Sequence, residues 1–242
     1  MMQPYFFPYL GYFDLINRSD LWVVFDTAQY IRHGWMNRNR ILHPDAGWQY
    51  VIAPLRKHAR TAPVNAVETQ PYDQWAPHLL GQLQHYRRRA PGFACAYGLV
   101  EECLAARETN LARLNLLTLR KTCEVLGLPF HPRVQSEMKL DLAPVDGPGD
   151  WALRVAEALG AGEYLNPPGG AALFDPAAFA RSRIRLEIQE PFVFEYGCRG
   201  YAFEPGLSVI DALMWNPPEV IRGHLGKIKA AAGLTPAVLS AS

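Results

Sequence analysis

The sequence predicts an α/β fold: a mixed sheet with a helical middle segment, about residues 72–127, packed on it. Three observations lead to this prediction. A compact apolar run of strand length, LWVVFD, lies near the N-terminus. The segment from Tyr72 to Leu126 carries apolar residues at three- and four-residue spacing, which is typical of helices. RIRLEIQ, from Arg183 to Gln189, alternates polar and apolar residues, as a strand with one solvent-facing side does.

The remaining elements follow from apolar spacing and from glycine and proline stop signals. They are the end of a short helix at residues 15–18, a strand at 48–54, a helix that begins at Thr109 or Asn110 and stops at Gly127, a helix at 150–160, and a structural helix within 203–225. We expect one domain over residues 1–242, with a helical subdomain at 72–127 as an open alternative.

Composition excludes several classes of protein. With 49% hydrophobic and 19% charged residues the chain is typical of a soluble globular protein, and its net charge of +1 provides no global field for DNA or an anionic membrane. Any polyanion site must therefore be a local cluster. Four cysteines without C-x-x-C spacing do not indicate a zinc site, so we expect no metal and no cofactor. The chain has no membrane-spanning run and no basic N-terminal region, so we expect a cytoplasmic protein.

The densest polar stretch runs from Phe25 to Ile41. Arginine forks bind phosphates or carboxylates in two-point contacts, and Asn and Gln can bind sugar hydroxyls or amides. After a strand, such a cluster would lie at the sheet edge, where α/β proteins bind ligands. A solvated, positively charged loop is an equal alternative. The polar residues are Gln29, Tyr30, Arg32, His33, Asn37, Arg38, Asn39 and Arg40.

A second basic cluster contains Arg56, Lys57, His58 and Arg60. The simpler interpretation, a charged surface hairpin tip, is favoured here. Together the two clusters could clamp a pyrophosphate, but neither has the glycine spacing of a P-loop or a dinucleotide fingerprint.

Two residues are candidates for acid–base chemistry. Asp26 ends the first strand, where it is either a general base or a turn cap. His33 is a candidate because its side chain titrates near neutral pH. Farther along, Gly169 and Gly170 either allow close approach of the backbone to a ligand or simply connect a helix to a strand.

Four stretches, in order over nearly the whole chain, resemble the WbqC-like family: MQPYFFPYLGYFDLI, QYIRHGWMNRNRI, YLNPPGGAALFD and FEPGLSVIDALMWN. Members occur in bacterial surface-polysaccharide gene clusters, and a glycine transferase role has been suggested for them. The resemblance implies N-acylation of an amino sugar by glycine or a similar amino acid. By motif position it implies functional roles for Gln3, Tyr12, Asp26, Asn37, Arg38, Asn39, Asn166, Gly169 and Gly170.

The resemblance also concerns the aromatic opening of the chain. Family members usually carry a few apolar residues before it that form a strand; here either the start of the sequence lies several residues late or the first strand is absent. Two prolines and neighbouring aromatics should make a stiff loop, set before any ligand arrives. Gln3 would then point toward Asp26 and the cluster at 37–39.

The preferred hypothesis is a transferase of surface-polysaccharide (O-antigen) biosynthesis that N-acylates a nucleotide-linked amino sugar. Its partners would be the nucleotide sugar or amino sugar and an activated amino-acid donor, with Gln3, Tyr30, Arg38 and Asn39 binding the sugar and phosphates and Asp26 or His33 as base. Two alternatives remain. The first is a nucleotidyltransferase-like enzyme, but the H-x-G-H phosphate signature of such enzymes is absent, because Tyr9–Tyr12 occupies the comparable place. The second is a non-catalytic binding or scaffold protein of polysaccharide assembly, which would need no nucleophile.

Overall fold

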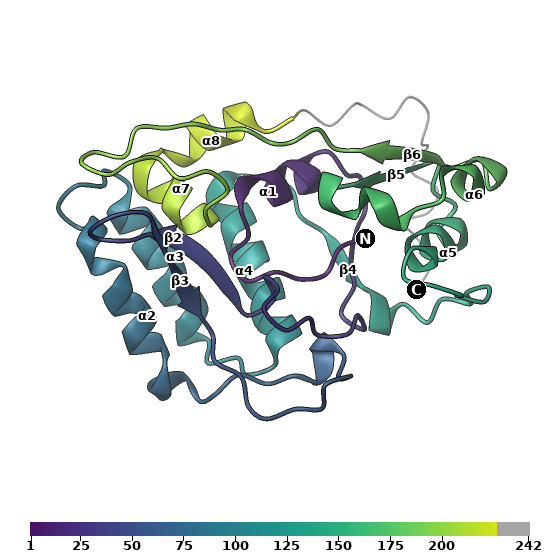
Figure 1. Ribbon diagram of the computed structural model, residues 1–242, viewed down its shortest axis with the longest axis horizontal. Coiled ribbons are helices and arrows are strands. Elements are labelled where there is room, and N and C mark those ends of the chain that lie inside the picture. Colours follow the sequence, from purple (N-terminus) through teal and green to yellow (C-terminus); the bar gives the residue numbers. More distant parts are fainter. Residues whose placement is uncertain (227–242) are drawn as a thin grey trace.

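The computed structural model describes residues 1–226 of the chain, which adopt the predicted mixed α/β fold (Figure 1). The predicted domain extends to residue 242, so its last 16 residues lie outside the described part. The helices are α1 (Leu10–Asn17), α2 (Ala76–Gln82), α3 (Phe93–Ala105), α4 (Leu111–Leu126), α5 (Asp150–Ala158), α6 (Pro176–Arg181), α7 (Val209–Trp215) and α8 (Pro218–His224). The strands are β1 (Trp22–Val24), β2 (Arg38–Leu42), β3 (Trp48–Ile52), β4 (Pro132–Val134), β5 (Glu163–Asn166) and β6 (Arg185–Ile188).

These strands form three two-stranded sheets within residues 1–226. Strands β1 and β4 pair in parallel, as do β5 and β6, whereas β2 and β3 form an antiparallel hairpin. Both kinds of pairing expected of a mixed sheet therefore occur, but in separate sheets rather than in one. The helical middle segment lies between β3 and β4 in the chain, and no described helix is long and apolar enough to cross a bilayer.

The first residues of the chain lie along the edge of β1. The amide of Met2 donates to the carbonyl of Val23 at 2.9 Å, and the amide of Phe25 donates to the carbonyl of Met2 at 2.8 Å. These bonds form a single parallel bridge between Met2 and Val24. The bridge places Gln3 directly after the residue that contacts β1.

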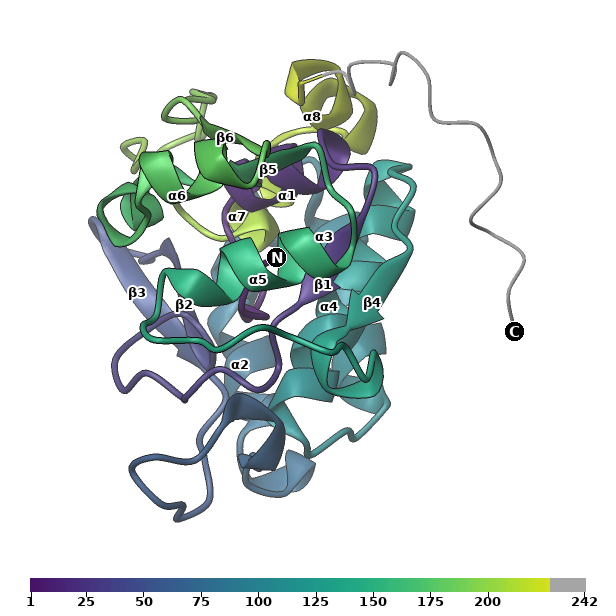
Figure 2. The same ribbon diagram turned by 90° about the vertical axis from the view of Figure 1, so that its right-hand side faces the viewer.

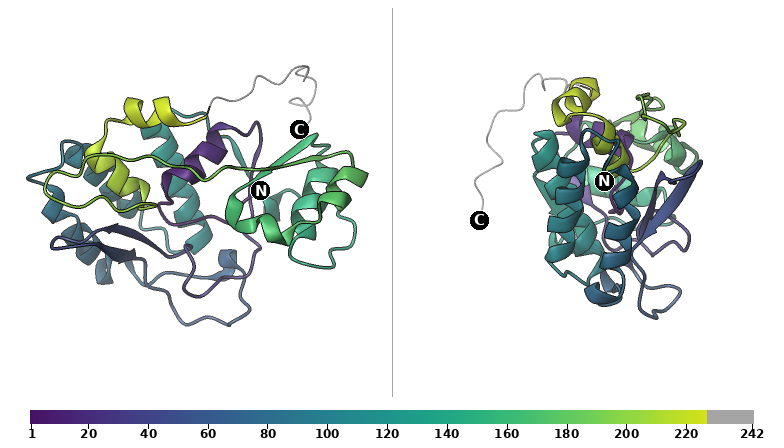
Figure 3. Two further views of the ribbon diagram at one scale, coloured as in Figure 1. Left: turned by 45° about the horizontal axis from the view of Figure 1, so that its top comes forward. Right: turned by 90° about the vertical axis from the view of Figure 1, so that its left-hand side faces the viewer.

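Helices α2 and α3 lie at one end of the molecule with α7 beside α3, and α4 packs against α3 nearer the middle (Figures 1 and 3). Helix α4 has the predicted ends. The side chain of Asn110 accepts the backbone N–H of Arg113 at 3.1 Å, and Gly127 at φ 65° terminates the helix in the left-handed region. The helical segment shares one hydrophobic core with α1 and α7.

The predicted helix within 203–225 is two helices. Helix α7 ends at Trp215, and α8 begins at Pro218, directly after Pro217. A proline cannot continue the backbone hydrogen bonds of a preceding helix, so the two prolines divide the segment. Inside α7, Asp211 is completely buried and accepts hydrogen bonds from the hydroxyls of Tyr86 and Tyr196. Burial raises the pKa of Asp211, and these hydrogen bonds act in the opposite direction.

Residues 150–188, from α5 to β6, form a lobe at the opposite end of the molecule from α2 and α3 (Figures 1 and 2). The lobe has a small hydrophobic core of its own, which includes Leu153, Tyr164 and Phe179. Phe179 is 1% exposed and lies against Tyr164, with ring centroids 5.7 Å apart. This core packs α5 and α6 against the β5–β6 sheet.

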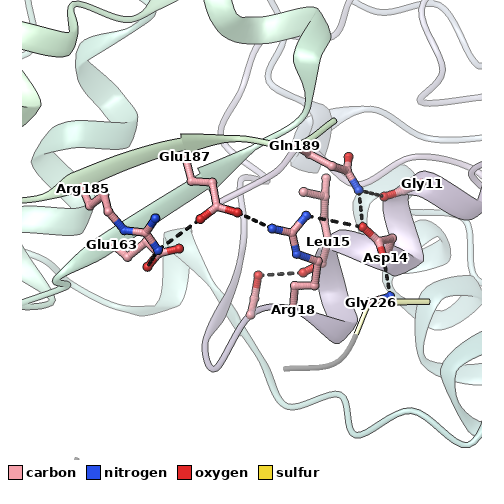
Figure 4. A network of polar contacts seen from close by, with 10 residues as sticks. Gly11, Asp14, Leu15, Arg18, Glu163, Arg185, Glu187, Gln189 and Gly226 are labelled. Atoms are coloured by element: carbon pink, nitrogen blue, oxygen red, sulfur yellow. Dashed lines mark hydrogen bonds and ion pairs between the residues drawn. The ribbon is translucent and has the colours of Figure 1, made fainter. Parts of the chain in front are cut away.

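A polar network ties this lobe to α1 (Figure 4). Arg18 at the end of α1 pairs with Glu187 on β6, and both side chains are mostly buried. Just after β6, the side-chain amide of Gln189 donates to the carbonyl of Gly11 at 3.0 Å and to the carboxylate of Asp14 at 2.6 Å. The position of the lobe therefore depends on α1, the helix that follows the aromatic opening.

Candidate functional site

A cleft of about 2220 Å³ opens between the N-terminal loops and the α5–β6 lobe. One wall comes from the opening of the chain and from segments within 25–38 and 52–60, and the other comes from segments within 145–152 and 164–174. Ligand pockets commonly enclose roughly 300–1,000 Å³. The cleft can therefore hold a large ligand or two reactants.

The charge of the cleft differs sharply from that of the whole chain. Five arginine and lysine side chains line the cleft. Arg56 forms an ion pair with Glu68 at 3.3 Å, but the other four make no ion pair with a carboxylate of residues 1–226. The whole second cluster lines the cleft, and so does the first cluster apart from Asn39 and Arg40. Permanent charges on the lining are Arg32, Arg38, Arg56, Lys57 and Arg60 against Asp146.

Aromatic side chains line the part of the cleft formed by the lobe. The rings of Phe25, which follows β1, and Trp151 on α5 lie with centroids 5.4 Å apart. Tyr164 and Phe174 form a second pair at 5.7 Å. Trp151, Tyr164 and Phe174 thus line the lobe side of the cleft, whereas all five cations come from the N-terminal segments, an arrangement that suits ligands with rings and phosphates.

The opening loop is held by side chains that bond its carbonyl oxygens. The hydroxyl of Tyr12 donates to the carbonyl of Gln3 at 2.7 Å, and the amide of Asn115 on α4 donates to the carbonyl of Pro4 at 2.9 Å. The Gln3 side chain lines the cleft and makes no hydrogen bond within residues 1–226. The loop thus presents an available amide to the cleft.

Deeper in the same loop, Phe7 has a left-handed backbone with φ 41°, which a bulky residue rarely adopts. Hydrogen bonds hold the chain in this unfavourable conformation. The amide of Asn39 donates to the carbonyls of Phe6 and Phe7, and the Ser208 hydroxyl also donates to the carbonyl of Phe7 at 2.7 Å. The stiff loop predicted from the prolines is therefore also clamped from β2 and from the start of α7.

The 30–38 segment forms a second set of ordered contacts. The Tyr30 hydroxyl donates to Asn37 at 2.9 Å, and the Asn37 amide donates to the carbonyl of Ala53 at 3.0 Å. Burial raises the pKa of Tyr30, while the charges of Arg38 and Arg32 lower it. Arg38 also donates to the carbonyl of Gly34 at 3.3 Å. These bonds fix the wall that carries the cations.

Asp26 lies beneath the cleft rather than on its lining. It is 3% exposed, and its carboxylate accepts the backbone N–H and the hydroxyl of Ser136 and the amide of Asn65, at 3.0, 2.5 and 3.1 Å. These bonds connect the end of β1 to two distant turns. Asp26 therefore positions the loops around the cleft floor.

At the other wall of the cleft, the turn that contains Asn166, Gly169 and Gly170 begins at the last residue of β5. The Tyr164 hydroxyl donates to Asn166 at 3.3 Å and to the carbonyl of Met1 at 3.1 Å. A side chain at Gly170 would meet the Asn166 amide at 2.5 Å, whereas one at Gly169 would meet nothing within 4 Å. A side chain at Gly170 would therefore displace the amide of Asn166, whereas one at Gly169 would displace nothing.

The structure brings most of the predicted site residues to one cleft. Asn39 and Asp26 are the exceptions: both are buried behind its surface. In the described chain, no group of three or more His, Cys, Asp or Glu side chains is arranged to hold a metal ion. The predicted residues on the lining are Gln3, Tyr12, Gln29, Tyr30, Arg32, His33, Asn37, Arg38, Lys57, Asn166, Gly169 and Gly170.

Comparison with known proteins gives this cleft a family context. The sequence profile of the WbqC-like protein family matches residues 3–223. The chain belongs to the WbqC-like protein family. It is 29% identical over 220 residues to "Uncharacterized protein Rv1507c" of Mycobacterium tuberculosis, which covers 88% of this chain and 91% of that protein. No solved structure matches the chain significantly.

Sequence reasoning missed part of the cleft of this WbqC-like protein. Asp146, Trp151 and Phe174 line it, although the sequence places them in or near an ordinary helix and a connection. Only the packing of the lobe against α1 brings them to the N-terminal loops. The proline and glycine content of 144–149 was the one available sign of a shaped segment.

Proposed function

We propose that this WbqC-like protein is a transferase of surface-polysaccharide (O-antigen) biosynthesis that N-acylates a nucleotide-linked amino sugar with glycine or a similar amino acid. The observation that supports this most is the juxtaposition of four cations without carboxylate partners and a set of aromatic rings in one cleft. A nucleotide-linked sugar carries its diphosphate between two ring systems. Its charge and shape match both walls.

In this reaction the sugar amine attacks the carbonyl carbon of an activated amino-acid donor. The C–N bond forms, the bond to the donor's leaving group breaks, and the amine loses a proton to a base. We assign the base to His33, because it lines the cleft. Asp26 is assigned a positioning role, since three hydrogen bonds already occupy its carboxylate. The free amide of Gln3 is a candidate donor to the developing oxyanion.

Thermal unfolding with UDP- and dTDP-linked amino sugars, and with the bare nucleotides as controls, tests the proposal. A ligand at about 100 times its dissociation constant should stabilise the fold by roughly 2.7 kcal/mol. We expect one amino-sugar nucleotide to exceed its bare nucleotide, and Arg32→Gln to reduce the shift. Arg113→Gln, an exposed change on α4 outside the cleft, is the matched control.

Turnover is measured by mass spectrometry of the sugar nucleotide after incubation with activated glycine. A glycyl adduct that depends on His33 would support the transferase. Binding without any adduct would favour the non-catalytic role, and no stabilisation by any sugar nucleotide would overturn the proposal.

A further inference from the structure

The outer face of the β2–β3 hairpin carries arginines and aromatic rings in contact with each other. Arg38 and Arg40 alternate on β2, and Arg40 lies opposite Tyr50 in the antiparallel register. The Arg40 guanidinium lies 5.4 Å from the ring centroid of Trp35 and 5.0 Å from that of Trp48. Arg38 lies 4.3 Å from Tyr50. We call these five residues the hairpin strip.

The hairpin strip is on the surface. Trp35 and Trp48 are 37% and 39% exposed, while Ile41 and Val51 on the inner face of the same hairpin are fully buried. The hairpin lies at the edge of the molecule in Figure 2. The two tryptophans are therefore not needed to complete the hydrophobic core.

The charges of the hairpin strip are not neutralised. Neither Arg38 nor Arg40 forms an ion pair with a carboxylate of residues 1–226, and the Nε of Arg40 is buried without a hydrogen-bond partner. The contact between Arg107 and Tyr72 shows the contrast. That guanidinium lies 4.9 Å from its ring but also pairs with Asp73 at 3.2 Å.

The hairpin strip continues from the cleft. Trp35 and Arg38 line the cleft as well, together with Ile52, which lies opposite Arg38. From there the strip runs along β2 and β3 toward Trp48 at the other end of the hairpin. At about 3.3 Å per residue, the five residues of β2 span roughly 13 Å.

We propose that the hairpin strip binds a short stretch of single-stranded nucleic acid that leads to or from the cleft. Exposed aromatic rings and arginine planes provide faces on which bases stack, and guanidinium groups bind phosphates in two-point contacts. A neutral sugar chain could stack on the rings but would leave both arginines without a counter-charge. The net charge of the chain, which argues against a DNA partner, does not bear on a local strip. The strip shares Trp35 and Arg38 with the cleft, whereas Arg40, Trp48 and Tyr50 lie outside it, so changes at those three test the strip separately from the proposed transferase.

Fluorescence anisotropy with a labelled single-stranded oligoadenylate, measured over a range of salt concentrations, tests this site. For single strands each phosphate contact makes the slope of log K against log salt more negative by about 0.7. We expect Arg40→Gln to make that slope less negative by about 0.7. We expect Trp48→Ala to weaken binding about tenfold with the slope unchanged, because stacking is lost. Arg107→Gln should change neither quantity.

Three results would overturn the proposal: no binding of the oligoadenylate by the natural protein at low salt, equal losses in Arg107→Gln and Arg40→Gln, or displacement of the probe by a neutral maltooligosaccharide. If Arg40→Gln does not fold, Trp48→Ala still gives a decisive result, since Trp48 is exposed. Sugar-nucleotide stabilisation is a separate measurement, so either site can fail without the other.

Discussion

The side-chain amide of Asn39 donates to the carbonyls of both Phe6 and Phe7, at 3.1 and 2.9 Å. Through this contact the buried face of β2 holds the aromatic opening of the chain. The same loop carries Gln3, whose side chain reaches the cleft. Asn39 therefore acts on the site by shaping its wall.

Replacing Asn39 with alanine should lower the free energy of unfolding by about 2 kcal/mol, because the carbonyl of Phe6 loses its donor and the carbonyl of Phe7 keeps only the hydroxyl of Ser208. Urea unfolding measures the change. Gln84→Ala is the control, since its exposed amide makes one long bond, 3.4 Å, to the carbonyl of Leu80. A loss in Asn39→Ala no larger than in Gln84→Ala would contradict the assigned role.

The two adjacent glycines after β5 form a matched pair for a second prediction. Gly170→Ala should destabilise the protein by about 1–3 kcal/mol, because the new methyl group overlaps the amide of the buried Asn166. Gly169→Ala should stay within about 0.5 kcal/mol of the natural protein, since its methyl group meets open space. Comparing their urea midpoints tests the packing. Equal effects would show that Asn166 moves freely.

The sequence alone predicted those features that depend on local chemistry. Asn110 and Gly127 set the ends of α4 through capping and left-handed geometry, both readable from neighbouring residues. The grouping of Asn37, Arg38 and Asn39 was less successful. The polar run around residues 37–39 does not indicate a strand, yet alternation along β2 places Arg38 on the cleft side and Asn39 in the core.

Long-range pairing explains the other differences. Strands β4 and β5 have only three and four residues, too few to show a period, and β4 pairs with β1, which lies far away in the chain. The role of Asp26 likewise depends on Ser136, 110 residues later. A turn cap and a general base were both reasonable from sequence, and only tertiary contacts distinguish them.

Asp211 leads to a prediction about pH. Burial raises its pKa above the ordinary value of 3.8, so the folded state binds the proton more tightly than the unfolded chain does. This contribution to stability is complete below about pH 3.8 and is lost as the pH rises through the folded-state pKa. Asp211→Asn removes the titration. The stability of the natural protein minus that of the variant should therefore fall above pH 4, by at most about 1.4 kcal/mol per pH unit.

Urea unfolding at a series of pH values measures this difference. Asp20→Asn is the control, because Asp20 is exposed and its side chain makes no hydrogen bond or ion pair within residues 1–226. A difference for Asp211→Asn that rises with pH would mean that the hydrogen bonds from Tyr86 and Tyr196 outweigh burial.

The pair of Arg18 and Glu187 joins α1 to the lobe that carries Trp151 and Phe174 into the cleft (Figure 4). Their side chains are 24% and 19% exposed, so water screens the pair less than it screens a surface pair. A double-mutant cycle with Arg18→Gln and Glu187→Gln should give a coupling energy of about 1.5–3 kcal/mol, the range for hydrogen bonds to charged groups.

The exposed pair of Arg181 and Asp175 within the lobe is the matched control, with an expected coupling of about 0.2–1 kcal/mol. If the lobe completes the ligand site, Arg18→Gln should also weaken sugar-nucleotide binding, whereas Arg181→Gln should not. Equal coupling energies for the two pairs would show that the lobe is held mainly by Gln189 and its bonds to Gly11 and Asp14. The lobe would then keep its place, and the cleft its shape, without the ion pair.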